Sequence, residues 1–158
     1  MVEKSKYKGR VKLLKGQFLH SIDNKGRLSI PARLRKNVSP EAENSFVLTL
    51  GIDKCIEIYP KDQWKLIEER LLKLNFFDQR EARFIRMMLQ NAQEDTMDAQ
   101  SRILITQPLL DYAGIKNEVL ILGALKKIEL WDPKTYSEYI SSSTETFEQI
   151  ASQVMRLE

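Results

Sequence analysis

Cysteine and histidine are almost missing from this chain of 158 residues, which has one of each, Cys55 and His20. A single cysteine excludes a disulfide within the chain, and one residue of each kind is too few for a Cys/His zinc site. Cys55 lies in an apolar, strand-like stretch, where a buried structural thiol is more common than a nucleophile. We therefore expect no metal, no cofactor and no thiol chemistry.

Long apolar runs and phosphate-binding loops are missing as well. No run approaches the roughly 18–20 apolar residues that cross a bilayer, and no apolar stretch of signal-peptide length follows the basic N-terminus. Glycine-rich phosphate loops and nucleophile elbows are absent. One pair of recurring carboxylates, Asp23 and Asp98, leaves a paired-acid site open, but no pocket-forming pattern accompanies it. We expect a cytoplasmic protein with no membrane partner and no small-molecule substrate, and not an enzyme.

The net charge of +3 hides an asymmetry along the chain. Residues 1–37 contain eleven Lys and Arg and two acidic residues, or +9, whereas residues 38–158 contain fourteen and twenty, or −6. A basic block on an otherwise acidic chain indicates a polyanionic partner, most simply nucleic acid. The basic residues before residue 15 are equally typical of a solvated tail, whereas those after residue 24 lie inside patterned sequence.

An internal repeat organises the chain. Residues 23–31, Asp-Asn-Lys-Gly-Arg-Leu-Ser-Ile-Pro, align with residues 98–106, Asp-Ala-Gln-Ser-Arg-Ile-Leu-Ile-Thr, at an offset of 75. A second block, 54–59, aligns with 126–131 at an offset of 72. The difference of three residues falls near the turn-rich loop 39–44, where a change in length is easily absorbed. Two aligned blocks in the same order predict two copies of one unit.

Each unit is predicted to contain four short strands. In the first unit the pattern predicts a strand, a tight turn, a strand, a short helix and a further strand pair, at residues 17–22, 23–26, 27–30, 31–36, 46–50 and 55–59. Asn24 and Gly26 suit the positive φ angles of a tight turn. Amphipathic helices join the copies without a flexible linker, and a unit of about fifty residues is too small to bury a core alone. We expect the units to pack around a pseudo-twofold axis.

The string Asp23-x-Lys25-Gly26-Arg27-x-x-Ile30-Pro31 resembles the signature of MraZ proteins, which contain two SpoVT-AbrB-type units. The resemblance covers roughly residues 14–140 and includes both copies of the motif. It implies a mainly β fold with helices, a tandem-repeat swapped-hairpin (AbrB/MazE/MraZ-like double-split) β-barrel decorated by α-helices. It also implies a sequence-specific transcriptional regulator that forms a ring-like homo-oligomer. Such a regulator binds repeated promoter boxes on double-stranded DNA at the nucleoid, upstream of a division and cell-wall gene cluster containing its own gene.

The pattern divides the chain into five segments: a basic N-terminal extension at 1–15, a first unit at 16–62, connecting helices at 63–93, a second unit at 94–137 and a C-terminal helical tail at 138–158. In the tail, Phe147, Ile150 and Val154 fit one helical stripe, which suits packing or an oligomer contact. A competing interpretation makes the chain an antitoxin-like protein-interaction module that uses the same barrel and binds a protein through this tail.

Three arginines at helical spacing, Arg80, Arg83 and Arg86, recur in the connecting helices. They either extend the basic surface or form salt bridges between subunits. Acidic residues such as Glu68, Glu69 and Glu81 are plentiful nearby, so the salt-bridge interpretation is favoured.

Five residues are predicted to contact DNA: Lys25, Arg27, Arg33, Arg35 and Arg102. Arg27 and Arg102 follow equivalent turns, and arginine bound through two hydrogen bonds to guanine is the commonest specific base contact. We expect Arg27 to read a base, Arg102 to be a weaker second reader, and the other three to contact phosphates. Asp23, Gly26 and Asp98 are predicted turn residues. The alternative is that Asp23 pairs with Arg27 or Lys25 and only stabilises the hairpin.

The second motif departs from the family pattern at Gln100, Ser101 and Thr106, where Lys or Gln, Gly and Pro are usual. Serine in place of glycine costs about 1 kcal/mol where a turn needs a positive φ. We therefore expect the second turn to differ in shape and to carry less positive charge. Whether this motif and residues 1–15 contact DNA stays open at this point.

Overall fold

The computed structural model describes residues 12–156, so most of the predicted basic extension lies outside the described residues. Residues 12–156 contain eight strands: β1 (Gln17–Ser21), β2 (Arg27–Ser29), β3 (Ser45–Leu50), β4 (Ile56–Pro60), β5 (Gln93–Thr96), β6 (Arg102–Leu104), β7 (Glu118–Ala124) and β8 (Lys127–Trp131). The helices are α2 (Ala32–Arg35), the 3-10 helix η1 (Pro40–Ala42), α3 (Lys61–Leu72), α4 (Gln79–Gln90), α5 (Gln107–Ala113), α6 (Pro133–Ser141) and α7 (Phe147–Val154). The predicted order of strands and helices is confirmed, with η1 as an addition in the loop predicted at residues 39–44.

The strands of one unit pair with strands of the other. A six-stranded antiparallel sheet has the order β1-β7-β8-β4-β3-β5, and a separate two-stranded ribbon joins β2 to β6. The strands on either side of each turn have different partners, because β1 pairs with β7 whereas β2 pairs with β6. In the registers, Leu28 lies opposite Ile103 and Glu57 lies opposite Glu129. These pairs join equivalent positions of the two units, as a pseudo-twofold axis requires.

The predicted barrel is not confirmed, since the six-stranded sheet is open and ends at β1 and β5. Burial is achieved without closure because the ribbon covers the sheet. Leu28 and Ile103 of the ribbon are buried in one core with Ile121 and Leu130 of the sheet. This shared core is formed by both units, which agrees with the expectation that neither unit buries a core alone.

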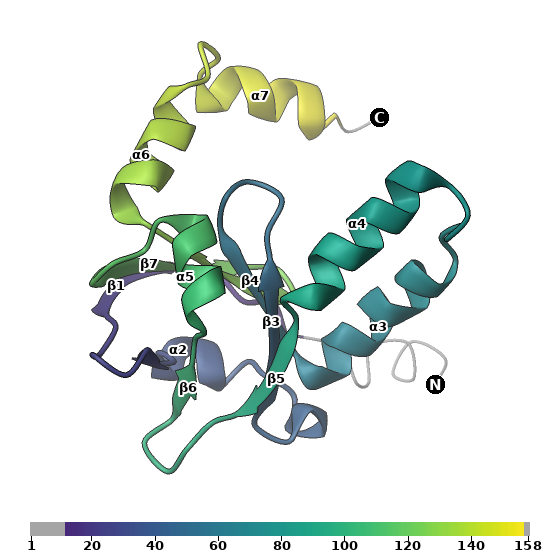
Figure 1. The fold of residues 1–158 in the computed structure, drawn as a ribbon. Coiled ribbons are helices and arrows are strands. Elements are labelled where there is room, and N and C mark those ends of the chain that lie inside the picture. Colours follow the sequence, from purple (N-terminus) through teal and green to yellow (C-terminus); the bar gives the residue numbers. More distant parts are fainter. Residues whose placement is uncertain (1–11, 157–158) are drawn as a thin grey trace, which may run out of the picture.

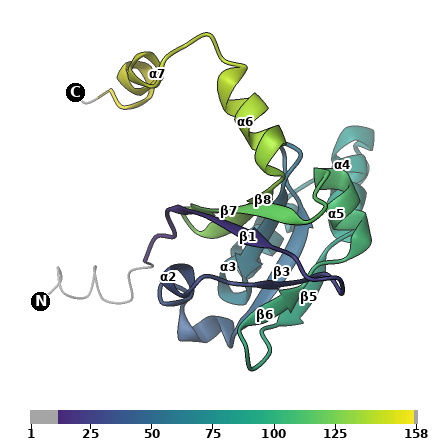
Figure 2. The same ribbon diagram turned by 90° about the vertical axis from the view of Figure 1, so that its left-hand side faces the viewer.

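The ribbon and the short helix α2 lie at one end of the molecule. Figure 1 shows α2 and β6 at the end opposite α6 and α7, and Figure 2 shows the same separation from the side. Helices α3 and α4 cover β3 and β4, where Trp64 packs with Val47 and Tyr59. Asp132 caps α6 by accepting a hydrogen bond from the Thr135 amide. Within residues 12–156 no helix combines the length and apolar character that a membrane crossing needs.

Candidate nucleic-acid interface

The first turn is organised by the carboxylate of Asp23. One oxygen, Oδ1, accepts hydrogen bonds from the amides of Lys25 and Arg27 at 2.9 and 2.8 Å. The other, Oδ2, accepts from Nε of Arg27 at 2.8 Å. Gly26 has a φ of +84°, and a Cβ there would lie 2.8 Å from the carbonyl oxygen of Ile105. The positive φ predicted for Gly26 is confirmed, whereas the positive φ predicted for Asn24 is wrong. The hydrogen bonds to the carboxylate close this turn with Gly26 as its only residue in the left-handed region.

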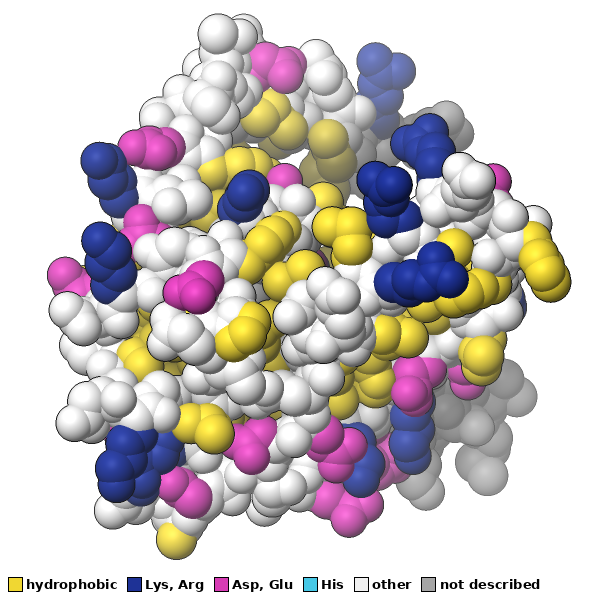
Figure 3. All heavy atoms as spheres, viewed as in Figure 1, with side chains coloured by type: hydrophobic (Ala, Val, Ile, Leu, Met, Phe, Trp, Pro, Cys, Tyr) yellow, Lys and Arg dark blue, Asp and Glu magenta, His cyan; other side chains and the backbone are white. Residues whose placement is uncertain are grey.

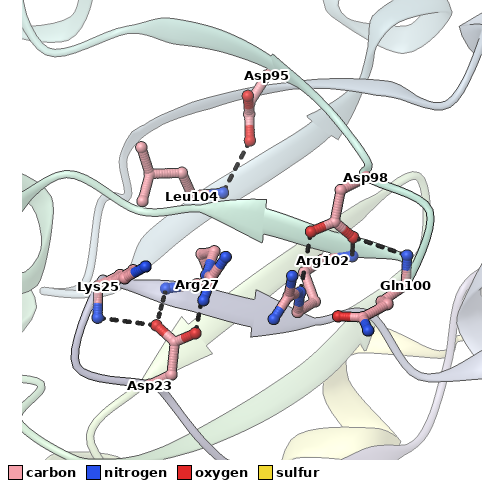
Figure 4. A network of polar contacts seen from close by, with 8 residues as sticks. All are labelled: Asp23, Lys25, Arg27, Asp95, Asp98, Gln100, Arg102 and Leu104. Atoms are coloured by element: carbon pink, nitrogen blue, oxygen red, sulfur yellow. Dashed lines mark hydrogen bonds and ion pairs between the residues drawn. The ribbon is translucent and has the colours of Figure 1, made fainter.

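The second turn has the same hydrogen bonds. Asp98 Oδ1 accepts from the amides of Gln100 and Arg102 at 2.9 Å each, and Oδ2 accepts from Nε of Arg102 at 2.9 Å (Figure 4). Ser101 takes the place of glycine with a φ of +60°. The expectation that this turn differs in shape is therefore wrong. The aspartate and the arginine fix the turn, and serine accepts the left-handed conformation.

The two motif arginines point to the same face of the ribbon. Arg27 lies opposite Leu104 in the antiparallel ladder, and Arg102 lies opposite Ser29. Opposed residues share a face, as do residues two apart on one strand. The arginines are thus diagonal neighbours, which are typically about 7–8 Å apart. Leu28 between them faces inward and is fully buried, so the arginine face is the outward one.

Each guanidinium is held from one side only. The side chains of Arg27 and Arg102 are 33% and 26% exposed, and Nε of each is bonded to its aspartate. Within residues 12–156 neither arginine makes a side-chain hydrogen bond through its two terminal nitrogens. The aspartate therefore orients the side chain and leaves those nitrogens able to donate a pair of hydrogen bonds.

Both aspartates are ionised at neutral pH. Hydrogen bonds from the backbone amide and side chain of Arg27 hold the pKa of Asp23 below its usual value. The amide and side chain of Arg102 do the same for the pKa of Asp98. A carboxyl group with a lowered pKa keeps its ion pair at every pH above the usual carboxylate pKa. The ion pair is lost only as the pH falls through the lowered pKa. The arginines therefore stay oriented throughout the physiological range.

The strand exchange places α2 beside the second turn. Ile30, at the end of β2, donates its amide to the carbonyl of Ser101 at 2.9 Å. Arg35 donates Nε to the carbonyl of Ile30 at 2.9 Å. Arg35 and Lys36 line a hollow of about 760 Å³ together with Asp98 and Ser101. The second turn, which has Gln100 where the first has lysine, thus gains cations from the first unit.

The first turn lies beside α5, which carries no basic residue. Ile105 donates its amide to the carbonyl of Gly26 at 2.8 Å. At the positions equivalent to Arg33, Arg35 and Lys36, α5 has Pro108, Leu110 and Asp111. Both ends of the ribbon therefore carry positive charge from the first unit. Lys25 supplies it at one end, and Arg35 with Lys36 supplies it at the other.

The five predicted contact residues are not all brought together. Lys25, Arg27 and Arg102 lie on the ribbon and its turns, and Arg35 lies beside the second turn. Arg33 is directed elsewhere, with its guanidinium 5.8 Å from the centre of the Phe18 ring. Lys36, outside the predicted set, shares the hollow with Arg35. The basic run that contains both was the available signal, but only the strand exchange shows which turn it reaches.

A polar cluster at the centre of the sheet has ligand-like groups, but protein partners already bind it. Cys55, Glu57 and Glu129 place possible ligand atoms within 4.8 Å of one another. Lys127 donates to Glu57 at 2.7 Å and forms an ion pair with Glu129 at 3.3 Å. Tyr59 also donates to Glu57 at 2.7 Å. Cys55 is buried, as predicted, and burial raises the pKa of its thiol to about 12. We interpret this cluster as a structural link between β4 and β8.

Comparison with known proteins gives one consistent result. Residues 13–87 and residues 88–157 each match the family described as "MraZ protein, putative antitoxin-like". The chain is similar to the "Transcriptional regulator MraZ" of Natranaerobius thermophilus, with 35% identity over 140 residues, 89% of this chain and 95% of that protein. It is 40% identical to the protein of the same name from Caldanaerobacter subterraneus over 139 residues, 88% of this chain and 94% of the relative. The Clostridium tetani protein is 35% identical over 142 residues, 90% and 96% of the two chains.

Proposed function

The chain belongs to the MraZ family, and we propose that it is a DNA-binding transcriptional regulator that contacts DNA through the β2–β6 ribbon. Its relatives are named as regulators, and the family is not one of enzymes. One observation carries the assignment of the surface. The two Asp–Arg turns present Arg27 and Arg102 on a single outward face of an antiparallel ribbon, and a two-stranded ribbon fits the major groove.

Specificity comes from the two arginines. With Nε bonded to its aspartate, each guanidinium keeps its terminal nitrogens for the O6 and N7 acceptors of guanine. Asp23 and Asp98 are positioning residues in this proposal. The pseudo-twofold axis of the ribbon matches the dyad of a DNA site in which two guanines lie on opposite strands.

Affinity comes from phosphate contacts at both ends of the ribbon. Lys25 and, at the other end, Arg35 with Lys36 approach the backbones that border the groove. Arg33 contributes to the general positive field beside β1. The acidic remainder of the chain keeps this field local to the ribbon end of the molecule.

The proposal extends to assembly and targets. A single ribbon covers a short site, so a ring-like homo-oligomer that presents several ribbons to repeated promoter boxes gains affinity through effective concentration. We propose that the boxes precede a division and cell-wall gene cluster containing the chain's own gene. The protein would act on nucleoid DNA in the cytoplasm.

The test measures binding of the full chain to a fragment of its own upstream region and to a scrambled fragment, at two salt concentrations. We expect selective binding that weakens with salt, and a loss of about 1–3 kcal/mol on Arg27→Ala. Lys65→Ala removes an exposed cation of α3 outside the ribbon and serves as the matched control. Equal weak binding to both fragments, unchanged by Arg27→Ala, would contradict the proposal and favour the antitoxin-like interaction module.

A further inference from the structure

An apolar groove lies between the α3–α4 pair and the sheet, away from the ribbon. It holds about 510 Å³, and its walls include Tyr59, Ile67, Leu71, Phe84, Met87 and Met88. Phe84 and Met87 on α4 are 47% and 50% exposed, so its rim is open. Figure 3 shows apolar side chains gathered over this part of the front face, with Lys and Arg side chains beside them. Apolar patches rimmed by polar groups mark interaction sites.

A second apolar surface lies on α7. The helix begins with a capping box in which Thr146 and Gln149 bond each other's backbone amides. Phe147, Ile150 and Val154 follow at intervals of three and four residues, so they share one face. They are 81%, 40% and 72% exposed. Helix α7 is thus a capped helix whose apolar face is largely exposed to solvent.

Helix α7 is placed away from the groove of its own chain. In Figure 1, α6 rises from the sheet and carries α7 beyond it. In Figure 2, α7 lies on the side of the molecule opposite α4. The apolar face of α7 therefore requires a partner other than the groove in the same chain.

The charges of the two surfaces are complementary. Helix α4 carries Arg80, Arg83 and Arg86 against a single acid, Glu81, which gives +2. No ion pair of these three arginines is found among residues 12–156. Residues 145–154 carry two acids, Glu145 and Glu148, and no basic residue, which gives −2.

We propose that α7 of one copy docks its apolar face in the α3–α4 groove of a second copy. The groove would receive Phe147, Ile150 and Val154, while the arginines of α4 meet the acids of residues 145–148. The contact is head-to-tail, because groove and helix are different surfaces, and such contacts generate rings when the rotation closes. This inference rests on the assembly in the proposed function and names its interface. Since the ribbon lies at the other end of each copy from α6 and α7, it stays free for DNA.

Two substitutions test the contact from either side. Phe147→Glu places a charge on the apolar face of α7, and Phe84→Glu places a charge at the groove, so each substitution should block one side of the contact. Both side chains are exposed enough for the fold to be kept. By native mass spectrometry, we expect the wild type to form an oligomer and each variant alone to be a monomer. A mixture of the two variants has one intact helix and one intact groove, so it should form a 1:1 heterodimer and nothing larger. Leu125→Glu, at an exposed residue outside both surfaces, is the control and should keep the wild-type mass.

Three outcomes would overturn the inference: a monomeric wild type, variants that keep the wild-type mass, or a mixture that forms no heterodimer. Arg27→Ala is measured in the same way and should keep the oligomer. Because DNA binding and mass are read on separate variants, loss of the interface and failure of the DNA proposal are distinguishable.

Discussion

The two turns of the ribbon share their end residues and differ in every residue between them, yet they have the same geometry. Asn-Lys-Gly separates Asp23 from Arg27, whereas Ala-Gln-Ser separates Asp98 from Arg102. The six carboxylate hydrogen bonds nevertheless correspond one to one, at 2.8–2.9 Å. An aspartate and an arginine four residues apart therefore define this turn. The residues between them adjust charge and strain.

The two ends of the ribbon also differ in where their positive charge comes from. The first turn carries its own lysine, and the second is flanked by a basic helix that belongs to the first unit. Judged by its own residues, the second motif is the weaker one. Strand exchange changes that assessment, because the other unit of the same chain supplies the surroundings of each turn.

The largest effect is expected where the two units differ most in chemistry, at the equivalent positions Cys55 and Lys127. Lys127→Ala leaves Glu57 and Glu129 facing each other across β4 and β8, and Glu57 is 4% exposed. We expect the free energy of unfolding to fall by about 3 kcal/mol, the cost of leaving a buried charge without its partner. Urea denaturation at pH 7 measures it. Lys126→Ala, at the exposed neighbouring residue, is the control. An equal loss of stability there would show that the ion pairs of Lys127 are not its cause.

The same ion pairs predict a pH dependence. The pKa of Lys127 is raised because its interactions with Glu57, and then with Glu129, outweigh its desolvation by burial. In the wild type this stabilisation is fully present below the usual lysine pKa and is lost as the pH rises through the raised value. The deficit of Lys127→Ala relative to the wild type should therefore shrink as the pH is raised through the raised pKa of Lys127, because the wild type then loses the same stabilisation. A deficit that stays constant as the pH rises through that range would assign the loss to packing alone.

The glycine and serine of the two turns allow a reciprocal exchange. Gly26→Ser introduces a Cβ 2.8 Å from the Ile105 carbonyl at a φ of +84°, and should destabilise the fold by about 2 kcal/mol. Ser101→Gly relieves a left-handed serine and should stabilise it by about 0.5–1 kcal/mol. Thermal unfolding of both variants gives the two signs. Two destabilising effects would show that Ser101 has contacts that outweigh its strain.

The smallest effect concerns the cations at the ends of the ribbon. Lys25→Gln and Arg35→Gln should each lower the slope of log K against log salt by about 1, with similar losses on specific and scrambled DNA. Fluorescence anisotropy over a salt series measures both slopes. If Arg35→Gln left the slope unchanged, the cations beside the second turn would not contact phosphate.

Much of this organisation could be predicted from the sequence, because it is local. The offsets of 75 and 72 placed both copies, and Asp23, Gly26 and Arg27 marked the first turn. The partner of each strand is not local, and only the resemblance to a family indicated an exchange. The shape of the second turn was predicted wrongly, because a propensity was assigned to Ser101 without the carboxylate bonds that offset it. The direction of Arg33 likewise depends on Phe18, a contact between α2 and β1.

The central claim is that the two turns form one symmetrical reading surface. It is tested most directly by comparing Arg27→Ala with Arg102→Ala on the same upstream fragment and its scrambled counterpart. Because the two guanidiniums are held in the same way, we expect each substitution to cost about 1–3 kcal/mol of specific binding, within a factor of a few of the other, with little change on scrambled DNA. A full loss on Arg27→Ala and none on Arg102→Ala would contradict the claim and leave the second turn as a structural copy only.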